Sequence, residues 1–161
     1  MTMQPPQAQR RTEPPEEPLT ILIVEDDPAI GDLLGEVVAE VPGWRAAVAR
    51  NAQEAIAVLR RVAADVFLFD VNLPGPSGPE LLAWLRGEPA NAGVPAVLMS
   101  AAGRGPQVRA ALQGGQAMAF LQKPFDLDEL LTVLHRAVQS IPGRGARRAA
   151  PRSGPAERRA A

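Results

Sequence analysis

The sequence predicts an α/β fold built on a doubly wound parallel sheet. Five short apolar runs alternate along the chain with five segments that have the periodicity of amphipathic helices. The first run is apolar except for Thr20, and the third is entirely apolar, so neither alternates with polar residues; this is typical of strands buried on both faces of a parallel sheet. Together these observations favour alternating strands and crossover helices.

The first unit consists of a strand at 19–24 and a helix at 28–40. The strand lies between Pro18 and a group of acids, and Asp27 with Pro28 forms a helix start, as N-cap and first helical residue. Pro42 and Gly43 then end the helix. Its expected apolar face consists of Ile30, Leu33, Leu34, Val37, Val38 and Val41.

The second and third strands are predicted at 44–49 and 66–69. The first of these is the weaker, because small residues interrupt its alternation. Asn51 is expected to cap a helix that continues to about residue 64, and the third strand ends at Asp70. The inward side of the helix is expected to contain Ala55, Ile56, Val58, Leu59 and Val62.

The remaining units follow the same alternation. A turn at 73–78 leads to a helix that Pro79 opens, and its apolar residues are Leu81, Leu82, Trp84 and Leu85. A fourth strand at 95–99 ends at Ser100, and a short helix at 106–113 has glycines on both sides. A fifth strand at 118–121 leads to Lys123. Asp126 then caps a last helix with Leu127, Leu130, Leu131, Val133, Leu134 and Val138 facing inward.

Composition divides the 161 residues into one domain and two extensions. Most of the proline and arginine excess lies before residue 19 or after residue 141. We expect a disordered Pro-rich extension at 1–18, a folded domain at 19–141 and a disordered Arg-rich tail at 142–161. The domain carries a formal charge near −5 and the tail near +5. A basic tail can bind nucleic acid or acidic surfaces, but we favour a solvated extension.

Several classes of function are excluded by composition. The chain has no cysteine and one histidine, His135, which excludes disulfide frameworks, thiolate metal sites and paired-histidine catalysis. No apolar stretch has the length of a membrane span, and the N-terminus lacks the apolar core of a signal peptide. We therefore expect a cytoplasmic protein without membrane contact.

Polar residues follow four of the five predicted strands where each strand ends. They are Glu25 and Asp26 after the first, Asp70 after the third, Ser100 after the fourth and Lys123, the one lysine of the chain, after the fifth. In an open parallel sheet, ligands bind outside the carboxyl ends of the strands. The pattern therefore predicts a polar site at this edge.

The chemistry of these residues suggests phosphoryl transfer. Clustered carboxylates repel one another, and a hard cation with oxygen ligands such as Mg²⁺ relieves the repulsion. A carboxylate beside the ion can act as a nucleophile toward a phosphoryl group, while Lys123 neutralises transferring oxygens and Ser100 binds one of them. The sequence thus has the groups for reversible acyl-phosphate formation on Asp70.

Four blocks, in this order and spacing, resemble the receiver domain of two-component response regulators: ILIVEDDP, FLFDVNLPGPSGPELL, VPAVLMSAAG and FLQKPF. The resemblance covers about 19–138, and within the family the chain is similar to single-domain, chemotaxis-type receivers. It implies a flavodoxin-like doubly wound sheet of five parallel strands in the order 2-1-3-4-5, with five helices. The loop at 73–78 departs from the usual Met-Pro-x-Met-Asp-Gly, although Ser77 retains the ability to cap the next helix.

The same resemblance implies a role for each site residue. Asp70 is the phosphoacceptor, and Mg²⁺ is held by Glu25, Asp26, Asp70 and the backbone carbonyl of Asn72. Ser100 and Lys123 are the switch hydroxyl and the phosphate-binding lysine. Phe120 occupies the position of the switch aromatic, and Pro124 that of a cis-proline.

The resemblance also implies partners. A histidine kinase or a histidine phosphotransfer protein would donate the phosphoryl group, and the face of the fourth helix, fifth strand and fifth helix would control a downstream protein of unknown identity. The tail is too short and too poor in apolar residues to make a DNA-binding domain, so we expect a single-domain receiver or a piece of a longer protein. We expect a monomer or weak dimer that catalyses only its own phosphorylation and dephosphorylation.

Two other functions remain open. A phosphohydrolase of the haloacid-dehalogenase type also uses an aspartyl nucleophile, but that family has a second Asp two residues later on the first strand, where this chain has Asn72 after the third. The other alternative is a pseudo-receiver that only binds partners. The retained acids, Ser100 and Lys123 favour the phosphorylated receiver over both.

Overall fold

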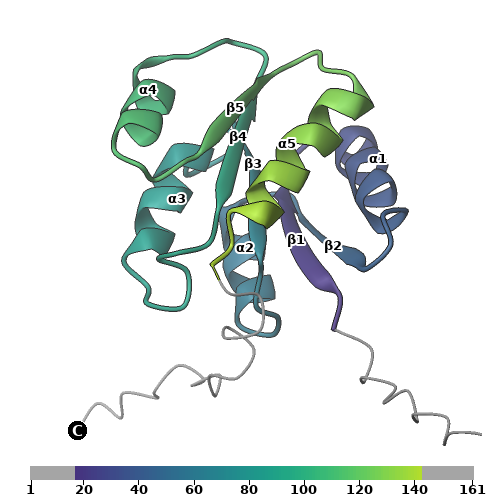
Figure 1. The fold of residues 1–161 in the computed structure, drawn as a ribbon. Coiled ribbons are helices and arrows are strands. Elements are labelled where there is room, and N and C mark those ends of the chain that lie inside the picture. The colour runs from purple at the N-terminus through teal and green to yellow at the C-terminus, as the bar shows by residue number, and fades with distance from the viewer. Residues whose placement is uncertain (1–16, 143–161) are drawn as a thin grey trace, which may run out of the picture.

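The computed structural model describes residues 17–142. The extensions predicted to be disordered lie outside the described residues, except for Glu17, Pro18 and Pro142. Figure 1 shows a central sheet with helices packed on both of its faces. No helix in the described range is long and apolar enough to cross a membrane.

Five strands and five helices alternate along the chain, as the sequence predicts. The strands are β1 (Leu19–Val24), β2 (Trp44–Ala49), β3 (Val66–Asp70), β4 (Ala96–Ser100) and β5 (Ala119–Gln122). The helices are α1 (Pro28–Ala39), α2 (Ala52–Leu59), α3 (Gly78–Arg86), α4 (Pro106–Gln113) and α5 (Leu127–Gln139). The strands pair in the order β2-β1-β3-β4-β5, all parallel, which confirms the predicted fold class.

The strand order places the carboxyl ends of four strands along one edge of the sheet. The order reverses at β1, which pairs with β2 on one side and with β3 on the other. In this register Asp70 lies beside Met99, and Ser100 lies beside Gln122, the residue before Lys123. The edge at this reversal is where ligands bind in such sheets.

Each face of the sheet packs against its own layer of helices. We call the helices on one face the α1/α5 layer and those on the other the α2/α3/α4 layer (Figure 1). The α1/α5 layer buries Leu34, Val38, Leu130, Leu134, Ala137 and Val138. The α2/α3/α4 layer buries Ala52, Ala55, Leu81, Leu82, Leu85, Val108 and Ala111. Burial of both faces explains why the three central strands, β1, β3 and β4, are almost entirely apolar.

The structure corrects one helix boundary. Helix α2 ends at Leu59, and not near residue 64. A turn follows it, in which the N–H groups of Arg61 and Val62 both donate to the carbonyl of Val58, at 3.0 and 2.9 Å. Three-residue bonds such as the one from Arg61 are common where a helix tightens at its last turn.

Three apolar side chains of the predicted helices are exposed, two of which, Leu33 and Leu127, were expected on the inward face. Leu33 is 50% exposed, Trp84 53% and Leu127 42%. A surface helix packs only one stripe against the sheet, so apolar residues beside that stripe remain in contact with solvent. In α1 the stripe consists of Leu34 and Val38, which are almost fully buried.

Candidate functional site

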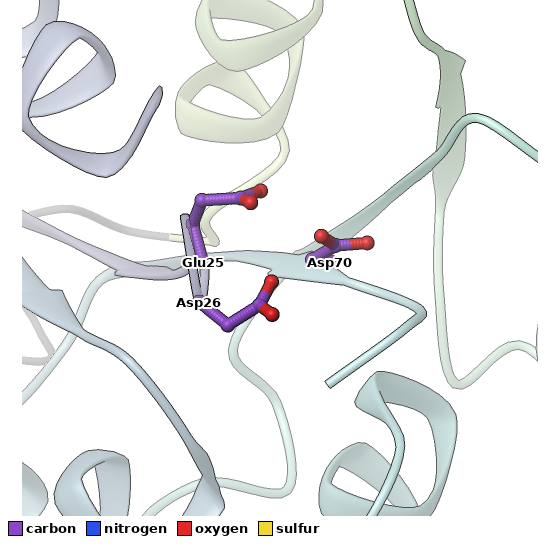
Figure 2. A group of neighbouring side chains, drawn as sticks. All are labelled: Glu25, Asp26 and Asp70. Carbon is purple, nitrogen blue, oxygen red and sulfur yellow. The ribbon is translucent and has the colours of Figure 1, made fainter. Parts of the chain in front are cut away.

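Three carboxylates meet at the edge where β1 and β3 end. Glu25 and Asp26 follow β1, Asp70 is the last residue of β3, and one oxygen from each lies within 4.8 Å of the others. Figure 2 shows the three side chains facing a common space. Glu25 and Asp70 are buried, and Asp26 is exposed. The site is therefore open to solvent on the side of Asp26.

Lys123 connects two of these carboxylates. Its Nζ lies 2.7 Å from Oε2 of Glu25 and 3.1 Å from Oδ2 of Asp70, and it donates a hydrogen bond to each. The residue follows β5, and its backbone N–H donates to the carbonyl of Ser100 at 2.9 Å. The fifth strand thus brings a cation to acids that the first and third strands supply.

The charges in this cluster shift two pKa values. Burial raises the pKa of Glu25 above its ordinary 4.5, and Asp70 raises it further, while the hydrogen bond from Lys123 opposes the change. Burial alone would lower the pKa of Lys123, but its hydrogen bonds and attraction to Glu25 and Asp70 raise it above 10.5. The lysine therefore remains a cation across the physiological range, while the buried acid carries a cost for ionisation.

Asn72 and Ser100 form a second set of contacts beside Asp70. The backbone N–H of Asn72 donates to Oδ1 of Asp70 at 3.1 Å, and its side-chain amide donates to Oγ of Ser100 at 3.2 Å. Oγ of Ser100 also accepts from the backbone N–H of Ala102 at 3.0 Å. Sequence reasoning placed both residues at the site but did not find the bond between their side chains, since no spacing rule predicts it.

Gly78 is a site residue that sequence reasoning did not identify. A Cβ at this position would collide with the carbonyl oxygen of Asp70 and lie 3.2 Å from Cα of Val71. Its N–H donates to the carbonyl of Val71 at 3.0 Å. The loop after Asp70 therefore folds back against the strand end, and only glycine fits there. The signal was the glycine that ends the turn 73–78.

The two remaining predicted residues flank this cluster. The peptide bond between Lys123 and Pro124 is cis. Phe120 is half-buried in β5 beside Leu98, and the guanidinium of Arg104 lies 5.6 Å from the centre of its ring. Because Leu98 and Ser100 are two residues apart on one strand, Phe120 lies on the same face of the sheet as Ser100.

The donor set fits a hard divalent cation. Three carboxylates from two adjacent strands offer oxygen ligands, one side is exposed to water, and Lys123 alone balances only part of their charge. Mg²⁺ uses one or two carboxylates and keeps several waters, which suits an open cluster of this kind. The arrangement can therefore hold a cation beside a buried carboxylate.

Comparison with known proteins agrees with this geometry. Residues 21–135 match the family model described as the response regulator receiver domain. The chain belongs to this family. The match spans β1 to α5 and includes every site residue described above.

The chain is similar to two curated relatives of different length. The chain is 33% identical over 117 residues to the transcriptional regulatory protein MalR of Bacillus subtilis, covering 72% of this chain and 48% of MalR. It is 34% identical over 124 residues to an uncharacterized 14.6 kDa protein of Leptolyngbya boryana, covering 77% and 93%. The chain therefore spans about half the length of MalR but nearly all of the second relative.

A solved receiver carries the metal that the acidic cluster fits. The structure of the receiver domain of sensor histidine kinase PA1611 from Pseudomonas aeruginosa PAO1 has a magnesium ion coordinated in its active site cleft. It is 26% identical, has a TM-score of 0.67, and the match covers 76% of this chain and 99% of that one.

Proposed function

We propose that this receiver accepts a phosphoryl group on Asp70 from a histidine kinase or a histidine phosphotransfer protein, in a reaction that needs Mg²⁺. The observation that supports it most directly is the position of Asp70. Its buried carboxylate lies beside Glu25 and Asp26, and 3.1 Å from the ammonium of Lys123. This is an arrangement of one nucleophile, a cation site and a fixed positive charge.

In the proposed reaction a carboxylate oxygen of Asp70 attacks the phosphorus of the donor phosphohistidine. The new O–P bond forms as the P–N bond breaks, and the imidazole nitrogen leaves with the electron pair. Asp70 is held for this attack by the N–H of Asn72 on one oxygen and by Lys123 on the other. Glu25, Asp26, Asp70 and the carbonyl of Asn72 would hold Mg²⁺, which when bound neutralises negative charge on the transferring phosphoryl group.

Lys123 and Ser100 have the complementary role on the phosphoryl oxygens. The ammonium of Lys123 is already at the carboxylate that would carry the group, so it stabilises the charge that develops there. Ser100 would exchange its bond with Asn72 for one with a phosphoryl oxygen. This movement of Ser100 would couple phosphorylation to a change of shape at the ends of β4 and β5, where Phe120 is the switch aromatic.

We propose that this receiver is a signalling module of the cytoplasm that does not turn over a substrate, and that its folded domain comprises residues 19–141. Its output would be a protein partner, bound through the face of α4, β5 and α5.

Mass spectrometry after incubation with acetyl phosphate and Mg²⁺ tests the proposal. We expect one added phosphoryl group on the wild type and none on Asp70→Asn, while Asp32→Asn, an exposed change on α1, labels normally. Labelling of Asp70→Asn would show that the acceptor is another residue. Failure of the wild type to label would favour the pseudo-receiver, and sustained hydrolysis of generic phosphate esters at about 1 per second or faster would favour the phosphohydrolase.

A further inference from the structure

The two helical layers carry opposite charge. The α1/α5 layer, taken as residues 26–40 and 126–139, has eight exposed carboxylates and one arginine, Arg136. The carboxylates are those of Asp26, Asp27, Asp32, Glu36, Glu40, Asp126, Asp128 and Glu129. The α2/α3/α4 layer, taken as 50–61, 78–88 and 104–113, has six arginines and three glutamates. The sheet thus separates a face near −7 from a face near +3.

Nothing in the described residues balances the acidic face. Among the described residues, the ion pairs are those of Lys123 with Glu25 and Asp70, and none of the eight carboxylates has a basic partner within 4.0 Å. Leu33 lies among them on α1 and is 50% exposed. The face is therefore both highly charged and partly apolar, which is the surface that an arginine side chain suits, with its charged head and methylene stem.

The same chain contains a segment of the complementary charge. Between residues 143 and 161 there are six arginines and one glutamate. The arginines are Arg144, Arg147, Arg148, Arg152, Arg158 and Arg159. The segment follows directly on α5, which belongs to the acidic layer. Covalent attachment gives it a high effective concentration at that face.

The length of the segment allows it to reach either layer. Nineteen residues span at most about 65 Å when extended, whereas a domain of this size has a radius of gyration of about 14 Å. Reach therefore does not select a face, and charge does, because the α2/α3/α4 layer repels a basic segment. We propose that residues 144–159 dock through their arginines on the α1/α5 layer of their own domain.

A spin label in the full chain tests the docking directly. The chain has no cysteine, so Ser153→Cys gives a single attachment point for a nitroxide. At about 0.1 M salt we expect broadening of amide signals in α1 and α5 but not in α2, α3 and α4. At about 1 M salt, where the screening length falls from about 10 Å to about 3 Å, the broadening should be lost. Equal broadening of both layers, or broadening that survives high salt, overturns the proposal.

Matched charge variants identify the surface. Glu36→Gln with Glu40→Gln removes two charges from the acidic layer and should weaken the broadening, whereas Glu80→Gln with Glu88→Gln removes two charges from the other layer and should not. The opposite result overturns the assignment. A mixture tests whether the tail docks on a second copy instead. It combines isotope-labelled protein without the nitroxide and nitroxide-labelled protein without the isotope. Broadening in that mixture overturns docking on the tail's own domain.

Discussion

At the scale of single residues, Glu25 shows that the carboxylates and Lys123 alone leave unfavourable electrostatics at the site. Its carboxylate is 1% exposed and shares Lys123 with Asp70. One ammonium faces two buried acids, so repulsion and desolvation are only partly offset. The site is thus arranged for an additional cation.

The raised pKa of Glu25 predicts a pH dependence of stability without Mg²⁺. The native state holds the proton more tightly than the unfolded state, so this contribution is fully present below about pH 4.5 and is lost as the pH rises through the native value. Lys123 acts at the alkaline end, because its stabilisation is present below about pH 10.5 and is lost above its raised native pKa. Urea unfolding from pH 4 to 8 should show a shallower fall for Glu25→Gln than for the wild type. A steeper fall in the variant would contradict the assignment.

The bond between Asn72 and Ser100 predicts a restraint on the switch hydroxyl. Asn72→Ala removes the 3.2 Å bond and leaves the bond from Ala102, so Oγ of Ser100 is freer to turn toward a phosphoryl group. A neutral hydrogen bond contributes about 0.5–1.5 kcal/mol, so affinity for beryllofluoride with Mg²⁺ should rise roughly two- to tenfold. Titration followed by NMR measures this affinity. Unchanged or weaker binding would mean that Asn72 does not restrain Ser100.

Gly78 predicts a steric limit at the phosphoacceptor. In Gly78→Ala the new methyl group would meet the carbonyl of Asp70, so the loop or the strand end must move. We expect a loss of about 1–3 kcal/mol in the free energy of unfolding, with slower labelling of Asp70. Gly105→Ala is the control, because its Cβ meets no atom within 4 Å and its φ is −69°, and it should cost less than about 1 kcal/mol. Similar losses in both variants would contradict the steric argument.

At the scale of elements, the sequence predicts the strands whose apolar composition follows from burial, but not the helix ends and side-chain exposures that depend on single local contacts. Strands β1 and β3 lie under helices on both faces, so their composition alone identified them. The end of α2 depends on the local turn in which Arg61 and Val62 share the carbonyl of Val58, and the exposure of Leu33 depends on which side of α1 faces the sheet. The site edge followed from strand order, whereas the bond from Asn72 to Ser100 and the fit of Gly78 required coordinates.

Helix α4 is expected to be the least stable helix of the proposed output face. It has eight residues, its N-cap Gly105 makes no side-chain hydrogen bond, and Gly114 and Gly115 follow it. Short helices of this kind depend on packing, here of Val108 and Ala111. Amide exchange in 103–120 should be faster than in α5 and should slow on adding an acyl-phosphate mimic with Mg²⁺. No change in this segment would exclude it from the switch.

At the scale of the whole molecule, the site exists only in the folded chain. Glu25 and Asp70 are separated by 44 intervening residues, and pairing of β1 with β3 brings them together. Mg²⁺ that binds this cluster therefore binds the native state and stabilises it, by about 2.7 kcal/mol at a concentration of 100 times its dissociation constant. Urea unfolding with and without Mg²⁺ should show this gain in the wild type and in Asp32→Asn, whose change lies on the surface of α1. The gain should largely disappear in Asp26→Asn, which removes the exposed ligand without disturbing the buried pair of Lys123. An equal gain in Asp26→Asn would mean that the ion binds elsewhere on the acidic face.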